Sequence, residues 1–226
     1  MKHTKLTSAL FLTLALLGCQ DTKDVPSPLS EKDHYKLIGE EIPFETAMAW
    51  LDFHKKSNAA QGRTEEAANF SVSAEKMQAL LSSTEDLTGV AFHYGIDSLG
   101  DKHIFLIPVD GSLSVWSTTQ DRVIIDANTG NEIDPSLASA WADNYKNAHP
   151  EELWFHFFGK NIFDDMLALP GFKNMDIAPA THDVELTPEL LLIIWEDETI
   201  ASGGRTELLY AIVFDASNAC PPCAVL

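Results

Sequence analysis

Apolar side chains recur every three or four residues in several stretches of the chain, which is the spacing of an amphipathic helix. In one stretch Pro43 opens the helix, and Ala47, Trp50 and Leu51 form its apolar face. In another, Ser73 precedes the apolar positions, and its hydroxyl can accept a free backbone N–H of the first turn. The pattern predicts five helices, over residues 43–54, 75–81, 135–148, 151–158 and 160–169.

Shorter apolar runs bounded by turn residues predict strands. Residues 103–109 are nearly all apolar, as in a strand that is buried on both faces, and Gly100 supplies the turn before them. Asn128-Thr129-Gly130 supplies another turn, within a hairpin over residues 122–133. Besides the two arms of that hairpin, the predicted strands are residues 90–96, 103–109, 113–117, 190–195 and 207–214.

The hairpin turn also matches the start of a calcium-binding loop, with Asp126, Asn128 and Gly130 in alternate positions. The glycine comes one place too early for such a loop, and Leu137 stands where a bidentate glutamate is needed. A plain hairpin turn is therefore the favoured interpretation.

Helices and strands come in clusters, without the regular strand–helix alternation of a parallel sheet. No internal repeat is visible in the sequence, and the length is ordinary for one domain. We therefore expect an α+β fold. It should form a single domain, residues 42–226, with a mostly antiparallel sheet and helices packed on it.

The N-terminus has the three parts of an export signal. Lys2 and Lys5 carry positive charge, residues 6–17 are mostly apolar, and Gly18 and Cys19 follow. A membrane-spanning helix needs about 20 apolar residues, so this shorter run favours a cleaved signal. An ordinary signal peptide or a small buried helix is the alternative.

The end of this segment, Leu16-Leu17-Gly18-Cys19, resembles the lipobox of bacterial lipoproteins. The resemblance implies that the thiol of Cys19 takes a diacylglycerol, that the signal is cut before Cys19, and that the new amine is acylated, for example with palmitate. It also implies an envelope protein anchored by lipid, at the outer membrane and facing either the periplasm or the cell surface. The expected organisation is a signal peptide over residues 1–18, a lipidated tether over residues 19–41, and the domain.

The chain is strongly acidic, with a formal net charge of −19. Loss of the signal removes Lys2 and Lys5 and makes the charge of the mature protein more negative still. A phosphate backbone would be repelled, so we expect no nucleic-acid partner. An anionic lipid surface would be repelled as well, so the lipid anchor must provide the hold on the membrane.

The chain ends in Cys220-Pro221-Pro222-Cys223, and two cysteines at this spacing in an exported protein favour a disulfide. A thiol–disulfide oxidoreductase is the sharper alternative, but its reactive pair needs a helix behind it to lower the thiol pKa. Only three residues follow Cys223. Half of a zinc site is a further alternative, for which no second cysteine pair exists.

This tail, together with the apolar run of residues 208–214, resembles the ending of acidic lipoproteins from Bacteroidota-type bacteria. His149-Pro150 and Phe157-Phe158-Gly159 resemble the middle of the same proteins. The resemblance covers short pieces, and it implies no activity and no site residue.

Glu152 and His156 are the candidate metal ligands, since they would lie one turn apart on the helix predicted over residues 151–158. His149 would lie on the same face, but two turns and about 10 Å from His156, too far to share one ion easily. The alternative is a solvated polar face opposite Leu153.

No nucleophile elbow, zinc-binding helix or phosphate loop occurs in the sequence, so we expect no catalytic residue and no cofactor. The favoured hypothesis is a non-enzymatic binding or interaction module, whose ligand is a protein or an extracellular molecule. The alternative is an envelope enzyme that depends on a metal at Glu152 and His156 or on the thiols of Cys220 and Cys223.

Overall fold

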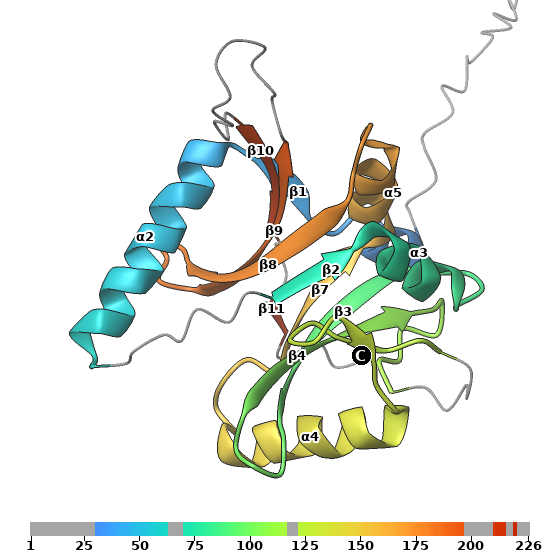
Figure 1. Cartoon of the computed structure of the whole chain (residues 1–226), viewed down its shortest axis with the longest axis horizontal. Helices are drawn as coiled ribbons and strands as arrows, with labels where there is room; N and C mark the ends of the chain where they lie inside the picture. Colours follow the sequence, from blue (N-terminus) through green and yellow to red (C-terminus); the bar gives the residue numbers. More distant parts are fainter. Residues whose placement is uncertain (1–29, 63–69, 117–121, 197–209, 216–218, 221–226) are drawn as a thin grey trace, which may run out of the picture.

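Strands dominate the computed structural model, which describes residues 30–62, 70–116, 122–196, 210–215 and 219–220 (Figure 1). In these residues eleven strands form two sheets in which every neighbouring pair is antiparallel. Sheet A has the order β1 (Glu40–Ile42), β10 (Tyr210–Asp215), β9 (Pro188–Glu196), β8 (Asn174–Thr181) and β2 (Phe70–Ser73). Sheet B has the order β11 (Ala219–Cys220), β7 (Phe155–Gly159), β3 (Gly89–Ile96), β4 (Lys102–Val109), β5 (Ile125–Asp126) and β6 (Asn131–Glu132).

The largest group of buried side chains, the central cluster, is shared by the two sheets and two short helices. Phe92 and Phe158 reach it from sheet B, Leu192 and Phe214 from sheet A, and Phe163 from a helix. Five helices accompany the sheets in the described residues: α1 (Glu31–Tyr35), α2 (Phe44–Ala60), α3 (Ala74–Ser82), α4 (Pro135–Ala148) and α5 (Lys160–Ala168). Helices α3 and α5 pack into the central cluster, so all these elements form one α+β domain, as expected from the sequence.

The two long helices cover the outer faces of the sheets. Trp50 of α2 packs with Leu191 and Ile193 of sheet A, while α4 packs Ala138 against the face of sheet B that carries Phe105. Figure 1 shows α2 on the outer side of sheet A and α4 below sheet B. Burial of these apolar faces is the main stabilising contribution to a fold of this kind.

Most of the predicted helices are present. Asp134 caps α4 with its carboxylate, Ser73 accepts the backbone N–H of Lys76 as expected, and α5 ends before Pro170. Helix α2 is longer than predicted and reaches Ala60, because two of the small residues that suggested a loop, Ala59 and Ala60, are strong helix formers.

The helix predicted over residues 151–158 is wrong. Residues 155–159 form β7, in which Phe155 and Phe157 face α4 while His156 and Phe158 face the other way. So many aromatic residues in a row satisfy helical and strand spacing alike. Aromatic residues pack well on a pleated surface, and pairing with β3 decides the outcome.

The strand predicted over residues 113–117 is also wrong for its described part. Residues 111–116 form turns, and Leu113 adopts a positive φ of 57° although it is buried. The strands β1, β2, β8 and β11 were not predicted. Pro179 within β8 is one reason, since proline is uncommon inside a strand that is paired on both sides.

The folded part begins earlier than the predicted boundary at residue 42. Ile38 is buried, and α1 precedes it. The carbonyls of Lys36 and Ile38 accept the backbone N–H groups of Asn161 and Gly159 at the start of α5. The segment predicted as the second half of a tether is therefore part of the domain.

The order of elements occurs twice, although no internal repeat was visible in the sequence. The first half runs α2, β2, α3, β3, β4, β5 and the second runs α4, β7, α5, β8, β9, β10. In both halves the short helix has nine residues, and the first strand of the following hairpin has eight.

The two halves exchange their short strands. Strand β2 of the first half pairs with β8 of the second, and β7 of the second pairs with β3 of the first. The registers match, since Ser73 at the end of β2 lies opposite Asn174, and Gly159 at the end of β7 lies opposite Gly89. Each long helix likewise covers the hairpin of the other half, α2 over β8 and α4 over β3.

A sequence signal for this duplication exists at 47–55 and 138–146, which both read Ala-x-Ala-Trp-x-Asp-x-x-Lys. Trp50 and Trp141, the tryptophans of the two matching segments, are the seventh residues of α2 and of α4. A second, shorter signal is the dipeptide Asp-Ala, whose aspartate is the last residue of β5 and of β10. These matches are short and are separated by unlike loops.

Gly95 tests how closely α4 approaches sheet B. A methyl group there would lie 2.3 Å from the Phe105 ring and 3.3 Å from Trp141 Cβ. We expect Gly95→Ala to lower the free energy of unfolding by about 1–3 kcal/mol, as overpacking does. The reverse change in the other half, Ala180→Gly, should cost about 1 kcal/mol by loss of one buried methyl. Urea denaturation of both variants measures this, and an unchanged Gly95→Ala variant would contradict the described packing.

Candidate functional site

The first hairpin-end cluster consists of Asp97, His103, Asp126 and Trp141. His103 Nδ1 lies 3.1 Å from Asp126 Oδ1, and His103 Nε2 lies 3.8 Å from Asp97 Oδ2. The imidazole stacks on Trp141 of α4 with ring centroids 4.5 Å apart. The side chains of all three polar residues are at most 14% exposed, so this is a nearly buried group of titratable side chains.

The two carboxylates of this cluster hold backbone turns. Asp97 Oδ1 accepts the backbone N–H groups of Leu99 and Asp101, each at 2.8 Å. These bonds, that of Asp101 foremost, keep the pKa of Asp97 below its ordinary value. Asp126 accepts the N–H of Asn128 and the hydroxyl of Thr129. The carboxylates thus already serve as acceptors inside the protein.

The second hairpin-end cluster, on sheet A, consists of Trp50, His182, Glu189 and Asp215. His182 stacks on Trp50 of α2 with ring centroids 4.6 Å apart. His182 Nδ1 accepts the backbone N–H groups of two residues of the hairpin loop. Burial raises the pKa of Glu189, while its hydrogen bond with Asp215 acts in the opposite direction.

The two hairpin-end clusters occupy equivalent positions in the duplicated halves. His103 and Glu189 are the second residues of β4 and β9. Asp126 and Asp215 are the last residues of β5 and β10, each opposite the fourth residue of the neighbouring strand. Asp97 and His182 directly follow β3 and β8. Histidine and carboxylate have thus changed places between the halves.

The long helices fasten to the same hairpins. Asn144 of α4 donates to the carbonyl of Ile96 at the end of β3. In the other half, His54 of α2 lies 2.7 Å from the hydroxyl of Thr181 at the end of β8. Each hairpin-end cluster therefore joins a helix, a hairpin and a third strand, which is a structural role.

The predicted metal ligands Glu152 and His156 do not share a helix. Glu152 lies in the turn before β7, where its carboxylate contacts His149 Nδ1 at 3.0 Å and accepts the Tyr145 hydroxyl at 3.3 Å. His156 is fully buried in β7. The helical spacing that suggested the pair is therefore wrong. Within the described residues no group of three His, Cys, Asp or Glu side chains could hold a metal ion.

A row of rings runs from His156 to His149, which in turn contacts Glu152. His156 lies 5.9 Å from Tyr94, Tyr94 stacks on Tyr145 at 5.3 Å, and Tyr145 lies 4.7 Å from His149. Burial raises the pKa of both tyrosines, so they are neutral at physiological pH. The row runs from the central cluster towards the surface at the end of α4.

Two histidines of sheet B are held neutral by burial. Burial lowers the pKa of His93 to about 4 and that of His156 to about 3. His93 Nδ1 lies 2.8 Å from the carbonyl of Tyr94. Within the described residues neither ring nitrogen of His156 has a hydrogen-bond partner. These two histidines were not singled out from the sequence as buried and neutral, because the burial of β7 and β3 was not visible there.

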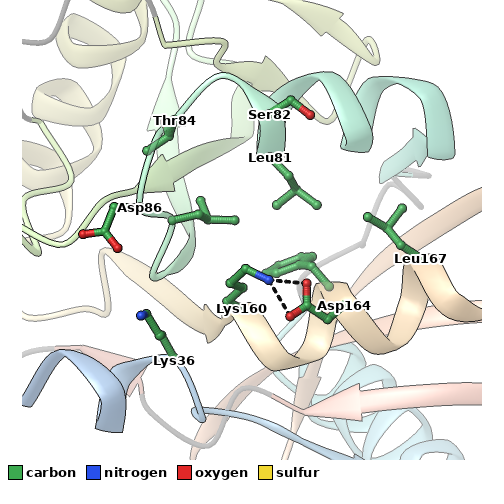
Figure 2. A pocket seen from close by; sticks show the side chains of 10 residues that line it. Lys36, Leu81, Ser82, Thr84, Asp86, Lys160, Asp164 and Leu167 are labelled. Atoms are coloured by element: carbon green, nitrogen blue, oxygen red, sulfur yellow. Dashed lines mark hydrogen bonds and ion pairs between the residues drawn. The ribbon is translucent and has the colours of Figure 1, made fainter. Parts of the chain in front are cut away.

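A pocket of about 370 Å³ opens between α3, α5 and the segment after α1 (Figure 2). Its apolar lining comes from Leu81, Leu87, Phe163 and Leu167. Two lysines and two aspartates stand around it, namely Lys36, Lys160, Asp86 and Asp164, of which Lys160 and Asp164 form an ion pair. Ser82 and Thr84 complete the lining. Sequence reasoning missed this site, because its residues come from three separate segments of the chain, at residue 36, 81–87 and 160–167.

A scan against protein-family models, a search of curated proteins and a search of solved structures each found no match to this chain. The resemblance to Bacteroidota-type lipoproteins therefore stays a prediction. Cys19 and Cys223 lie outside the described residues, as do the signal peptide and residues 20–29 of the tether. Of Cys220 only the backbone is described, paired with Phe155 in β11. No helix in the described ranges is long and apolar enough to cross a membrane.

Acid should destabilise the protein through the neutral histidines. Their pKa is lowered on folding, so below the ordinary value of 6.5 the unfolded chain binds protons that the folded protein does not. We expect the free energy of unfolding to fall as the pH falls from about 6.5 to about 4, by up to about 1.4 kcal/mol per pH unit for each histidine.

The contribution of His156 to this pH dependence is separable. His156→Phe should remove the contribution of one histidine to the loss of unfolding free energy between about pH 6.5 and pH 4. This expectation holds whatever the effect of the substitution on stability at neutral pH. His34→Gln, at an exposed position of α1, should leave the pH profile unchanged. Urea titrations at several pH values measure both. Equal profiles for His156→Phe and the parent protein would contradict a buried neutral His156.

Removal of His103 tests the first hairpin-end cluster. His103→Ala leaves Asp97 and Asp126 without the group between them, and we expect it to lower the free energy of unfolding by about 1–3 kcal/mol. Lys102→Ala, at the exposed neighbouring position, should change it by less than about 0.5 kcal/mol. Thermal unfolding of the two variants makes the comparison, and equal stability would show that His103 does not bridge the turns.

Proposed function

We propose that this protein is an envelope lipoprotein, held at the outer membrane by lipid on Cys19, whose domain acts as a non-enzymatic binding or interaction module. The observation that carries the binding role is the pocket between α3 and α5. It combines an apolar lining with side chains of both charges, which is the kind of surface that orients a small polar ligand or a headgroup.

The use of the polar side chains supports a non-enzymatic role. The carboxylates of Asp97 and Asp126 accept backbone and side-chain donors and hold hairpin turns. His182 Nδ1 is likewise engaged by backbone N–H groups. A general base needs a lone pair directed at a substrate, and these groups direct theirs at the protein itself.

The enzymatic alternative has less support. The helix that would have paired Glu152 with His156 is absent, and Glu152 contacts Tyr145 and His149 instead. The backbone of Cys220 belongs to a strand, whereas a reactive cysteine pair is activated by a helix N-terminus. A structural disulfide between Cys220 and Cys223 fits this position better than a reactive thiol pair does.

The anchor is supported by the first nineteen residues, where positive charge, an apolar run and Gly18-Cys19 come in order. Several acyl chains bind a bilayer far more firmly than one chain does. A strongly acidic protein gains little from the charge of an anionic membrane, so the acyl chains must provide most of the binding.

Metabolic labelling with a palmitate analogue tests the anchor. We expect the parent protein to be labelled and to sediment with membranes, and Cys19→Ala to lose the label because the acylated thiol is gone. Cys223→Ala should keep both label and membrane association, which controls for general effects of removing a cysteine. An unlabelled parent protein, or a labelled Cys19→Ala variant, would contradict the proposal.

A further inference from the structure

We propose that the face of the domain around the α3–α5 pocket docks on zwitterionic phospholipid headgroups of the membrane that holds the anchor. A zwitterionic headgroup carries a phosphate and an ammonium group. The inference rests on the proposed lipid at Cys19 and adds a second, non-covalent contact between the domain and the same bilayer.

The length of chain between Cys19 and the domain makes this contact possible. The first described residue is Ser30, which caps α1, so eleven residues follow Cys19 up to and including the cap. Even fully extended, eleven residues span about 40 Å at most. The tether expected from the sequence was twice as long. The shorter connection limits the distance between the proposed lipid at Cys19 and Ser30 to about 40 Å, so α1 can reach the bilayer surface.

The pocket lies on that side of the domain. Lys36 directly follows α1 and lines the pocket, and Lys32 of α1 forms an ion pair with Asp86, another lining residue. Helix α1 has five residues, so the point where the chain leaves for the anchor lies only about 8 Å along the helix from its end. The pocket therefore lies close to Ser30, the first described residue on the side of the proposed anchor.

Exposed leucines accompany the pocket. Leu167 lines it with 41% of its surface exposed, and Leu37, beside Lys36, is 57% exposed. Exposed leucines next to lysines are typical of surfaces that enter the headgroup region of a bilayer. Figure 2 shows Leu167 at one end of the pocket and Lys36 at the other.

The charges of the pocket match both ends of a zwitterionic headgroup. The ammonium groups of Lys36 and Lys160 suit a phosphate, and among the described residues the buried hydroxyl of Thr84 has no hydrogen-bond partner. Asp86 suits an ammonium group, as does the C-terminal end of α3 at Ser82, where the helix dipole is negative. The ion pairs already present reduce the net charge of the pocket, so the pocket favours neither an anion alone nor a cation alone.

The net charge of the protein selects against anionic lipids. A formal charge of −19 repels an anionic surface, while a zwitterionic bilayer presents no net charge to oppose approach. The proposed partner is thus a bilayer rich in zwitterionic phospholipid.

Hydrogen–deuterium exchange of the full-length lipidated protein tests the proposal. The protein is compared in non-ionic detergent micelles and in vesicles of equal parts phosphatidylethanolamine and phosphatidylcholine. We expect amide exchange in residues 81–87 and 160–167 to slow by about tenfold in the vesicles, with little change in the hairpin-end clusters.

Two matched variants distinguish docking from general membrane effects. Leu167→Gln should lose most of the protection in vesicles, because it removes an apolar contact at the pocket. Leu137→Gln changes a leucine of α4 that is 43% exposed, almost the same fraction, and should keep the protection. Retained protection in Leu167→Gln would overturn the proposal.

The mass of the N-terminal peptide is measured in the same samples, so that the two proposals fail in different ways. An unacylated Cys19 would overturn the anchor. An acylated Cys19 with equal exchange in vesicles and micelles would overturn headgroup docking and leave the anchor standing. The same protection in micelles on addition of soluble phosphoethanolamine would assign the pocket to a free zwitterion and likewise overturn docking.

Discussion

The exchange of β2 and β7 between the two halves of the chain is the constraint on which the rest of the structure depends. Each short strand completes the sheet of the other half, and its last residue lies opposite the first residue of the long hairpin there. The register then sets where α3 and α5 begin, and hence what they place in the central cluster. A slip of one residue would turn Val72 and Phe158 out of that cluster. The two halves are therefore interdependent.

Duplication explains why the polar interior groups come in two similar sets. In both hairpin-end clusters a histidine stacks on a tryptophan of the covering helix, and carboxylates lie beside it. His103 and Glu189 occupy the same position of the two hairpins, so a polar side chain stands there in both halves. Buried polar groups of this kind are stable when they are paired, and here the pairing fastens helix to sheet.

The start of the domain and the α3–α5 pocket belong together physically. Segment 36–39 supplies carbonyl acceptors to the N-terminus of α5, which ties the chain that leads to Cys19 to the helix that lines the pocket. These backbone hydrogen bonds therefore hold the segment after α1 and the start of α5 in a fixed arrangement beside the pocket.

Local information was enough for those elements whose periodicity and end signals agree. Helices α4 and α5, the β3–β4 hairpin with its turn at Gly100, and the α+β class were all predicted from spacing, caps and turn residues, and all are present. The repeat left a trace in the sequence around Trp50 and Trp141 as well, but five identical residues within nine positions, among unlike loops, did not reveal it.

Only the tertiary structure decided the features that depend on contacts between residues far apart in the chain. His156 is buried because β7 lies between β3 and β11, although a helical spacing fits the same letters. The α3–α5 pocket and the hairpin-end clusters draw residues from segments far apart in sequence, and no local pattern encodes their proximity. By itself the sequence determined the charge of the protein and the class of its fold, and it predicted export and a lipid anchor, because these follow from composition and short-range order. The sites follow from which strands meet, and that is decided by burial of the whole chain.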